Sequence, residues 1–179
     1  MSPDLFSPWR EFLAEVDSLL KEPCQLHCIG GFAVVSAYGL PRSTNDLDYI
    51  SIESANLPPD LEAIAGEGSA LDKKHRVHVH RVTIATVPED YEKRLIELFA
   101  NKFKNIRLLV LDPYDVVLSK LSRNIERDRE DVAYLARTRQ LDPNILRERY
   151  QEELRPNLIG PPERHDNTLK FWTEAYFSS

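Results

Sequence analysis

The sequence predicts an α+β fold with a mixed α/β front half and a helical rear part. Apolar residues recur at helical spacing over residues 8–20, and they alternate with polar residues over 77–87, as is typical of a strand. Two Asp-Pro pairs, at residues 112–113 and 142–143, each place a capping carboxylate before a proline. That arrangement begins a helix, so helix signals dominate the rear of the chain.

The first helix and strand lead to a glycine pair. The helix of residues 8–20 ends before a proline, and a short apolar strand is expected over 25–29. Gly30 and Gly31 interrupt this strand and lead into a helix of small residues over 32–38.

A weaker helix and three further strands complete the front half. Residues 44–52 are the clearest strand-like stretch that follows, alternation predicts a long strand over 77–87, and an apolar run predicts another over 105–111. Residues 58–74 include a plausible helix, although two glycines weaken its middle.

Helices are expected throughout the rear part. Their predicted ranges are 112 to about 124, 127–137, 142 to about 154, and an aromatic-bearing terminal helix over 167–177. We expect residues 1–111 to form a core with an N-terminal helix. Residues 112–179 then form a helical region that packs on this core as one compact unit.

Charge and hydropathy limit the classes of partner. The formal net charge of -6 and the pI of about 5.4 give no general attraction to nucleic acid or to an anionic membrane. A local basic patch can still bind RNA. No apolar stretch approaches the roughly 20 residues that span a bilayer, and residues 1–15 carry no secretion signal. We therefore expect a cytoplasmic protein without a membrane partner.

Two cysteines lie close together at the start of a predicted strand. Cys24 and Cys28 form no disulfide framework, which fits a reducing cytoplasm. With His27 between them they suggest zinc, but no second ligand pair has the usual spacing. Small side chains that are buried at the start of a strand are the simpler explanation.

A glycine pair and an acidic pair carry the candidate chemistry. Gly30 and Gly31 let backbone N–H groups approach a phosphate at a strand-to-helix turn. Asp46 and Asp48 lie two apart on a predicted strand, so both carboxylates point to one face, roughly 7 Å apart. Two convergent carboxylates suit Mg²⁺, which combines a few carboxylates with water and phosphate oxygens.

Each pair is common by itself. A glycine pair is as readily a helix C-cap or a tight turn, and about five acidic pairs at this spacing are expected by chance from this composition. The order and distance of the two pairs together are more restrictive.

The two pairs belong to a longer pattern: Gly-Gly, a short helix, then Arg-x-Thr-x-Asp-x-Asp. Its residues are Gly30, Gly31, Arg42, Thr44, Asp46 and Asp48. This pattern resembles the signature of minimal polymerase-β-like nucleotidyltransferases, and it is most similar to the toxin-type branch, the abortive-infection AbiEii group. The resemblance implies a nucleotidyltransferase-like mixed sheet flanked by helices.

A second block extends the resemblance to about residues 26–135. In the toxin-type branch a helix carries a lysine toward the nucleotide, and a following Arg-Asp-x-x-Asp run carries an acidic partner. Lys120 and Asp131 are the matching positions. Without the resemblance, Lys120 is equally a solvated helix lysine and Asp131 a surface salt-bridge partner. The terminal helices match nothing that we can name.

The resemblance implies a Mg²⁺-dependent or Mn²⁺-dependent transfer of a nucleotidyl group from a nucleoside triphosphate. The acceptor is an RNA such as tRNA, a protein or a small molecule, and a toxin–antitoxin or phage-defence role implies a cognate antitoxin. The implied catalytic residues are Asp46, Asp48, Lys120 and Asp131, the first two as metal ligands. The implied nucleotide-binding residues are Gly30, Gly31, Arg42, Thr44 and Lys120; Arg42 is equally a structural partner of the acidic site.

The pattern lacks one expected part. Active enzymes of this fold usually add a third carboxylate from a later strand, and residues 76–87 contain no acid. His80 can substitute as a metal ligand or general base, although His78 and His80 more simply fill a half-buried strand face. A zinc site of His75, His78 and His80 lacks a closing ligand.

Two other hypotheses follow from this gap. One is a non-catalytic nucleotide-sensing or partner-binding module on a degenerate nucleotidyltransferase scaffold. The other is an unrelated α/β domain in which the pattern is accidental.

Overall fold

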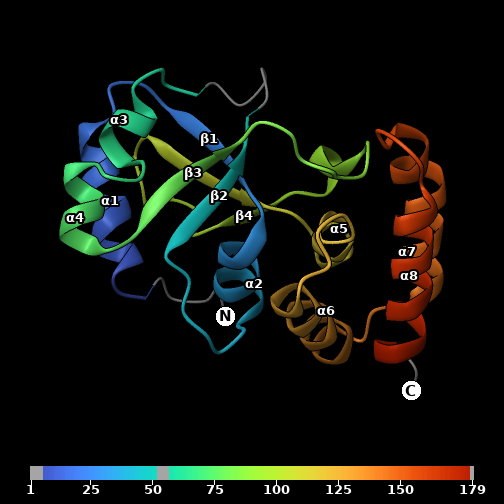
Figure 1. Ribbon diagram of the computed structural model, residues 1–179. Helices are drawn as coiled ribbons and strands as arrows, with labels where there is room; N and C mark the ends of the chain where they lie inside the picture. The colour runs from blue at the N-terminus through green and yellow to red at the C-terminus, as the bar shows by residue number, and fades with distance from the viewer. Residues whose placement is uncertain (1–5, 52–56, 178–179) are drawn as a thin grey trace. The chain divides into compact units, whose positions relative to one another are not determined.

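The computed structural model describes residues 6–51 and 57–177, and the chain forms two compact units. The first unit comprises Met1–Ile84 and Leu95–Val110, and the second comprises Ala85–Arg94 and Leu111–Ser179. A five-stranded mixed sheet with flanking helices, together with the C-terminal helices, confirms the predicted α+β class (Figure 1).

The sheet belongs to the first unit, and its strand order is β3-β2-β1-β5-β4. The strands are β1 (Cys24–Cys28), β2 (Asp46–Ile50), β3 (His78–Val82), β4 (Ile96–Leu98) and β5 (Ile106–Val110). β1 is antiparallel to β2 and parallel to β5, β2 is parallel to β3, and β4 is antiparallel to β5. The central strand β1 is almost wholly buried, as is expected of a strand that pairs on both sides.

The two cysteines lie in this central strand. Cys24 and Cys28 are free and buried, as the simpler explanation predicted. Burial raises the pKa of the Cys24 thiol to about 11, so the group stays protonated at neutral pH.

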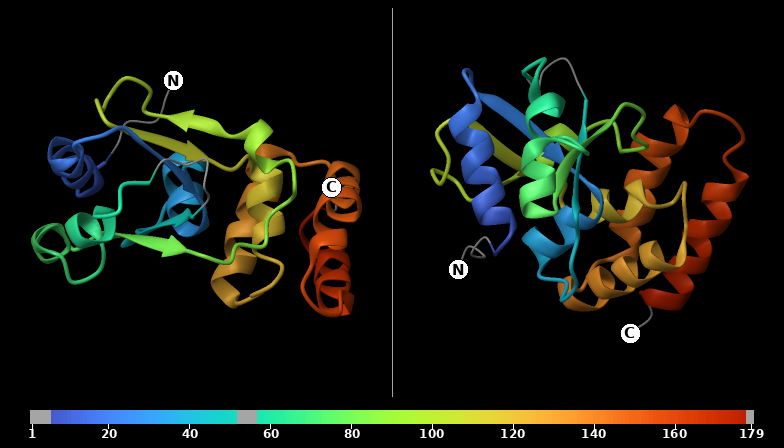
Figure 2. Two further views of the ribbon diagram at one scale, coloured as in Figure 1. Left: turned by 90° about the horizontal axis from the view of Figure 1, so that it is seen from above. Right: turned by 60° about the vertical axis from the view of Figure 1, so that its left-hand side comes forward.

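Four helices are present in the described part of the first unit. They are α1 (Trp9–Leu19), α2 (Gly30–Tyr38), α3 (Leu61–Ala65) and α4 (Ala70–His75). Helix α1 buries its apolar face, and Trp9 packs edge-on against Phe32 of α2. Helix α2 is buried along most of its length, which explains its small apolar residues. Helices α1, α3 and α4 lie side by side (Figure 2).

Two predicted elements of this unit are shorter than expected. The single helix predicted over 58–74 is two helices, because Gly66 ends α3 with an extended backbone (φ -76°, ψ 176°) and Gly68 has a φ of +79°. The long strand predicted over 77–87 is only β3. Its partner β2 ends at Ile50, which pairs with Val82, so later residues have no ladder to join. The predicted residue 52 lies outside the described residues.

Two short elements escaped prediction. Residues Tyr91–Arg94 form the 3₁₀ turn η2, and β4 is a three-residue edge strand. Neither is long enough to show a hydrophobic period.

The second unit is helical. Its elements are η2, α5 (Pro113–Ser119), α6 (Glu126–Arg139), α7 (Pro143–Arg149), the π-helical turn η3 (Tyr150–Leu154), the 3₁₀ turn η4 (Arg155–Asn157) and α8 (Glu163–Tyr176). Both Asp-Pro helix starts are confirmed, since Asp112 accepts a hydrogen bond from the N–H of Asp115 and Asp142 accepts one from Asn144. No helix of the described part of the chain has the length and hydropathy needed to cross a membrane.

Two boundaries of this unit differ from the prediction. Helix α5 ends at Ser119 rather than near residue 124, because the N–H groups of Lys120 and Leu121 bond three residues back and tighten the chain into turns. Helix α8 begins at Glu163, directly after Pro162, and so starts four residues before the predicted helix at 167.

Candidate active site

The corner between β1 and α2 favours glycine at residue 30. Gly30 is the first residue of α2 and has a φ of +66°, which disfavours any residue with a Cβ. A Cβ built on Gly30 would lie 2.5 Å from Oδ2 of Asp48. The corner therefore brings the backbone of residue 30 directly against this carboxylate.

The second glycine faces different partners. A Cβ on Gly31 would lie 3.0 Å from Oγ1 of Thr44 and 3.2 Å from Nη2 of Arg42. The two glycines thus contact the second half of the sequence pattern at separate points, although 11 residues separate Gly31 from Arg42 in the chain.

The two carboxylates share one face of β2. Leu47 and Tyr49 are fully buried, whereas Asp46 and Asp48 are half-buried and lie on the opposite face. The Ile29 N–H donates to the carbonyl oxygen of Asp48 over 2.9 Å, and Thr44 Oγ1 donates to Oδ1 of Asp46 over 3.0 Å. These bonds hold the acidic pair beside the glycine corner.

His80 is the third ionisable group of this site. It lies opposite Asp48 on the neighbouring strand β3, and its Nδ1 is 2.8 Å from Oδ1 of Asp48. Its side chain is 60% exposed, so an approaching molecule can reach the ring. His80 therefore stands where the third carboxylate was expected.

The other two histidines of the zinc hypothesis point elsewhere. His75 contacts Glu15 over 3.1 Å, and His78 contacts Asp72 over 3.4 Å. The three histidines thus face three different carboxylates. Over residues 6–51 and 57–177, no three His, Cys, Asp or Glu side chains form a group that could hold a metal ion.

The acidic pair nevertheless fits Mg²⁺ or Mn²⁺ brought in with a nucleotide. Mg²⁺ is usually held by one or two carboxylates, with water and substrate phosphate oxygens filling the other positions. Asp46 and Asp48 supply two carboxylates on one face, next to the glycine corner that begins α2. A third protein ligand is not required for that coordination.

In the second unit, Lys120 lies in a buried ionic cluster. Its Nζ is 2.8 Å from Oδ2 of Asp131 and 3.2 Å from Oδ1 of Asp128. Lys120 is 4% exposed, Asp131 is 1% exposed and Asp128 is fully buried. The solvated-lysine and surface salt-bridge alternatives are therefore wrong.

Asp128 has a second cationic partner. Arg123 donates to both of its carboxylate oxygens over 2.8 and 2.7 Å. Burial alone would raise the pKa of Asp128, but the hydrogen bonds from Arg123 and the charge of Lys120 hold that pKa below its usual value. Asp128 therefore remains ionised at neutral pH.

One family matches nearly the whole chain. It is described as a nucleotidyltransferase of unknown function (DUF6036), and it matches residues 10–177. The chain belongs to this nucleotidyltransferase family. No curated protein and no solved structure matches the sequence.

In this DUF6036 nucleotidyltransferase, the sequence pattern missed Asp128 as a partner of Lys120. Asp128 and Asp131 are three residues apart on α6, a spacing that places both carboxylates on one helix face. That spacing is visible in the sequence and was the available signal. The pairing of His80 with Asp48 had no such local signal, because it depends on the alignment of two strands.

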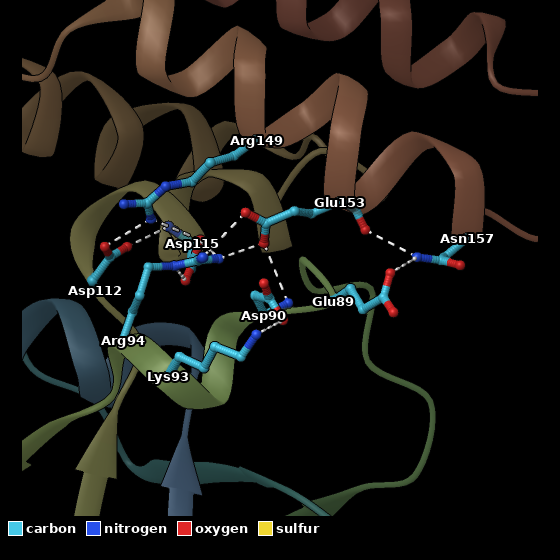
Figure 3. A network of polar contacts seen from close by, with 9 residues as sticks. All are labelled: Glu89, Asp90, Lys93, Arg94, Asp112, Asp115, Arg149, Glu153 and Asn157. Carbon is cyan, nitrogen blue, oxygen red and sulfur yellow. Dashed lines mark hydrogen bonds and ion pairs between the residues drawn. The ribbon is translucent and has the colours of Figure 1, made fainter.

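A second ionic network of the DUF6036 chain lies in the same unit and was not predicted (Figure 3). Arg94 bonds Asp115 over 2.9 Å and Glu153 over 2.7 Å, and Arg149 bonds Asp112 over 2.7 Å and Asp115 over 3.0 Å. Asp115 is fully buried, and burial raises its pKa despite the two arginines. The network ties η2 and η3 to the start of α5.

Proposed function

We propose that this chain is a Mg²⁺-dependent or Mn²⁺-dependent enzyme that transfers a nucleotidyl group from a nucleoside triphosphate to an acceptor. The observation that carries the proposal is the contact of the Gly30-Gly31 corner with Asp48, Thr44 and Arg42. Family membership supports the reaction class.

The corner is suited to a polyphosphate. Two residues without side chains begin α2, so its first N–H groups and the positive end of its dipole are accessible to an anion. The first turn of α2 contains no acidic residue that would repel phosphate. The guanidinium of Arg42 lies beside Gly31 and adds a positive charge there.

Asp46 and Asp48 are the proposed ligands of the metal ion, which would neutralise charge on the phosphates when bound. Thr44 orients the carboxylate of Asp46 through the bond to Oδ1. His80 orients that of Asp48 through the 2.8 Å contact. The acceptor hydroxyl would then attack the α-phosphate in line and lose its proton to water, while the bond between the α- and β-phosphates breaks and pyrophosphate leaves.

Lys120 and Asp131 are assigned from the family resemblance and from their own contact. Lys120 neutralises phosphate charge, and Asp131 holds its ammonium group in one position. The ion pairs with Asp131 and Asp128 hold the ammonium group of Lys120 in one position, and its role toward phosphate rests on the resemblance.

The test measures transfer of label from α-³²P nucleoside triphosphates to a panel of acceptors that includes tRNA, proteins and small molecules. We expect Mg²⁺-dependent transfer that falls at least about 100-fold in the Asp46→Asn/Asp48→Asn variant, because phosphate charge is no longer neutralised. Asp60→Asn, an exposed carboxylate on another element, is the control and should retain activity. Undiminished transfer by the double variant would contradict the proposal.

A second candidate function is a non-catalytic nucleotide-sensing or partner-binding module. The observation that favours it is the presence of His80 where active enzymes of this fold carry an acid. Calorimetry with Mg²⁺ and nucleotide distinguishes the two functions. Tight binding without transfer to any acceptor supports the module.

A toxin role is a finer proposal that rests on the resemblance to the AbiEii group. It predicts that expression of the chain slows cell growth and that Asp48→Asn relieves this effect. It further predicts that a neighbouring gene encodes an antitoxin. Growth that is unaffected by the wild-type chain would contradict a toxin role.

A further inference from the structure

A cleft of about 630 Å³ lies in the first unit next to the glycine corner. It is lined by residues 6–8, 35–36 and 39–45. Arg42 and Thr44 connect the cleft with the glycine corner, because they line the cleft and also lie against Gly31. The cleft follows the side of α2, where residues 35, 36 and 39 share one helix face.

Ser36, one of the residues that line the cleft, has a hydroxyl that lacks a partner among the described residues. Ser36 is 2% exposed, and its Oγ makes no hydrogen bond to any described part of the chain. A helical serine usually bonds the carbonyl oxygen one turn back, and a buried hydroxyl without a partner destabilises the fold. A bound molecule that offers a polar atom to Ser36 would remove this cost.

The charge of the lining selects the kind of molecule. None of the twelve described residues around the cleft is acidic, and Arg42 carries the one formal charge among them, although the whole chain has a net charge of -6. The walls beside it are apolar, with Phe6, Val35 and Leu40 contributing side chains. Such a lining complements a flat apolar body that carries a negative group.

We infer that this cleft binds a small aromatic anion. Its negative group lies at Arg42, its ring lies between the apolar walls, and a polar atom of the ligand bonds Ser36. The aromatic anion in the cleft and a polyphosphate at the glycine corner share Arg42 and Thr44, so binding of one weakens binding of the other. This coupling rests on the proposed function, whereas binding of the aromatic anion does not.

The probe is 1-anilinonaphthalene-8-sulfonate, which combines aromatic rings, one sulfonate and one N–H group. Its fluorescence is titrated with the full-length protein and with three variants. We expect one site per chain, an affinity about five-fold weaker in Ser36→Ala, and an affinity at least about ten-fold weaker in Leu40→Glu. Leu19→Glu changes a 53% exposed residue of α1 outside the cleft and should leave the affinity unchanged.

The Tm of Ser36→Ala also shows whether a loss of probe affinity comes from a destabilised fold. Because the hydroxyl has no partner, its removal should leave the Tm unchanged or raise it. Probe binding that is unaffected by both cleft variants, or that never saturates, would overturn the inference. Binding seen only as a dimer dissociates in sedimentation would show that a second copy of the chain fills the cleft and would also overturn the inference.

Inorganic triphosphate with Mg²⁺ tests the coupling. Its binding is measured by calorimetry, and we expect it to weaken the probe affinity several-fold. Triphosphate that binds without any effect on the probe would overturn the coupling. A protein that binds the probe but no triphosphate would contradict the proposed function and leave the aromatic-anion site in place.

Discussion

The carboxylate of Asp48 occupies the space that a side chain on Gly30 would need. Its Oδ2 lies 2.5 Å from the ideal Cβ position, and residue 30 also has a positive φ. Two separate constraints, one of backbone conformation and one of space, thus require glycine at the corner. Only the constraint of space involves the candidate active site, because it comes from the carboxylate of Asp48.

Gly30→Ala should separate these constraints when it is compared with Gly68→Ala. Both residues have positive φ values, +66° and +79°, but a Cβ on Gly68 meets nothing within 4 Å. Backbone strain is therefore similar in both variants, at about 1–2 kcal/mol. In urea unfolding, the free energy of unfolding should fall by about 1–3 kcal/mol more in Gly30→Ala than in Gly68→Ala. Gly30→Ala should also lose nucleotide binding, because the new side chain displaces Asp48. Equal losses of stability in the two variants would show that Asp48 moves aside freely.

His80→Asp should place a third carboxylate beside Asp48, since the two residues pair directly across β2 and β3. Without metal, repulsion between the carboxylates should lower the Tm; with Mg²⁺ the Tm should recover, and Mg²⁺ affinity should rise about ten-fold. Thermal unfolding in EDTA and in Mg²⁺, with calorimetry, measures both effects. His80→Asn removes the imidazole without adding charge, so Mg²⁺ should raise its Tm less than that of His80→Asp, because only Asp46 and Asp48 hold the ion. An Mg²⁺ effect on the Tm that is absent from both variants would contradict a metal site at Asp48.

Asp128→Asn should make stability less dependent on acid pH. The folded pKa of Asp128 lies below the value of about 3.9 for an unfolded chain, so its ionised form favours folding. This contribution is complete above the unfolded pKa and is lost as the pH falls through the folded pKa. The difference in unfolding free energy between wild type and variant should therefore stay constant from about pH 5 to 8 and shrink below about pH 4. Urea unfolding across this range checks it, and a difference that is as large at pH 3 as at pH 7 would contradict the assignment.

Arg94→Met should destabilise the second unit by about 3 kcal/mol, because it removes a bidentate partner from the fully buried Asp115. The adjacent Lys93→Met is the matched control. Lys93 is 74% exposed and pairs only with Asp90 among the contacts of Figure 3, so its loss should cost under about 1 kcal/mol. Urea unfolding followed by circular dichroism compares the two. Similar losses of unfolding free energy in Arg94→Met and Lys93→Met would mean that Arg149 alone is a sufficient partner for Asp115.

Local chemistry made part of this protein predictable. The Asp-Pro helix starts at 112–113 and 142–143 were predictable because a capping carboxylate and a proline act within a few residues. The shared face of Asp46 and Asp48 was predictable because side chains alternate along any strand. The family resemblance rested on the same local patterns, and the match over residues 10–177 confirms the superfamily.

Long-range pairing decided the rest. The length of β3 was set by where its partner β2 ends, and the contact of His80 with Asp48 was set by the register of those two strands. Neither property is encoded within a short window of sequence.

The sequence by itself determined the residue types at the corner: glycines that free backbone N–H groups and two acids on one strand face. The tertiary structure alone decided that Gly30 touches Asp48 and that Lys120 is buried between two carboxylates. It also decided that Ser36 lines a cleft and that its hydroxyl has no partner in the part of the chain that the structure describes. The physical reason is that conformational preference acts between neighbours in the chain. Burial and hydrogen bonding depend on which distant segments the fold brings together.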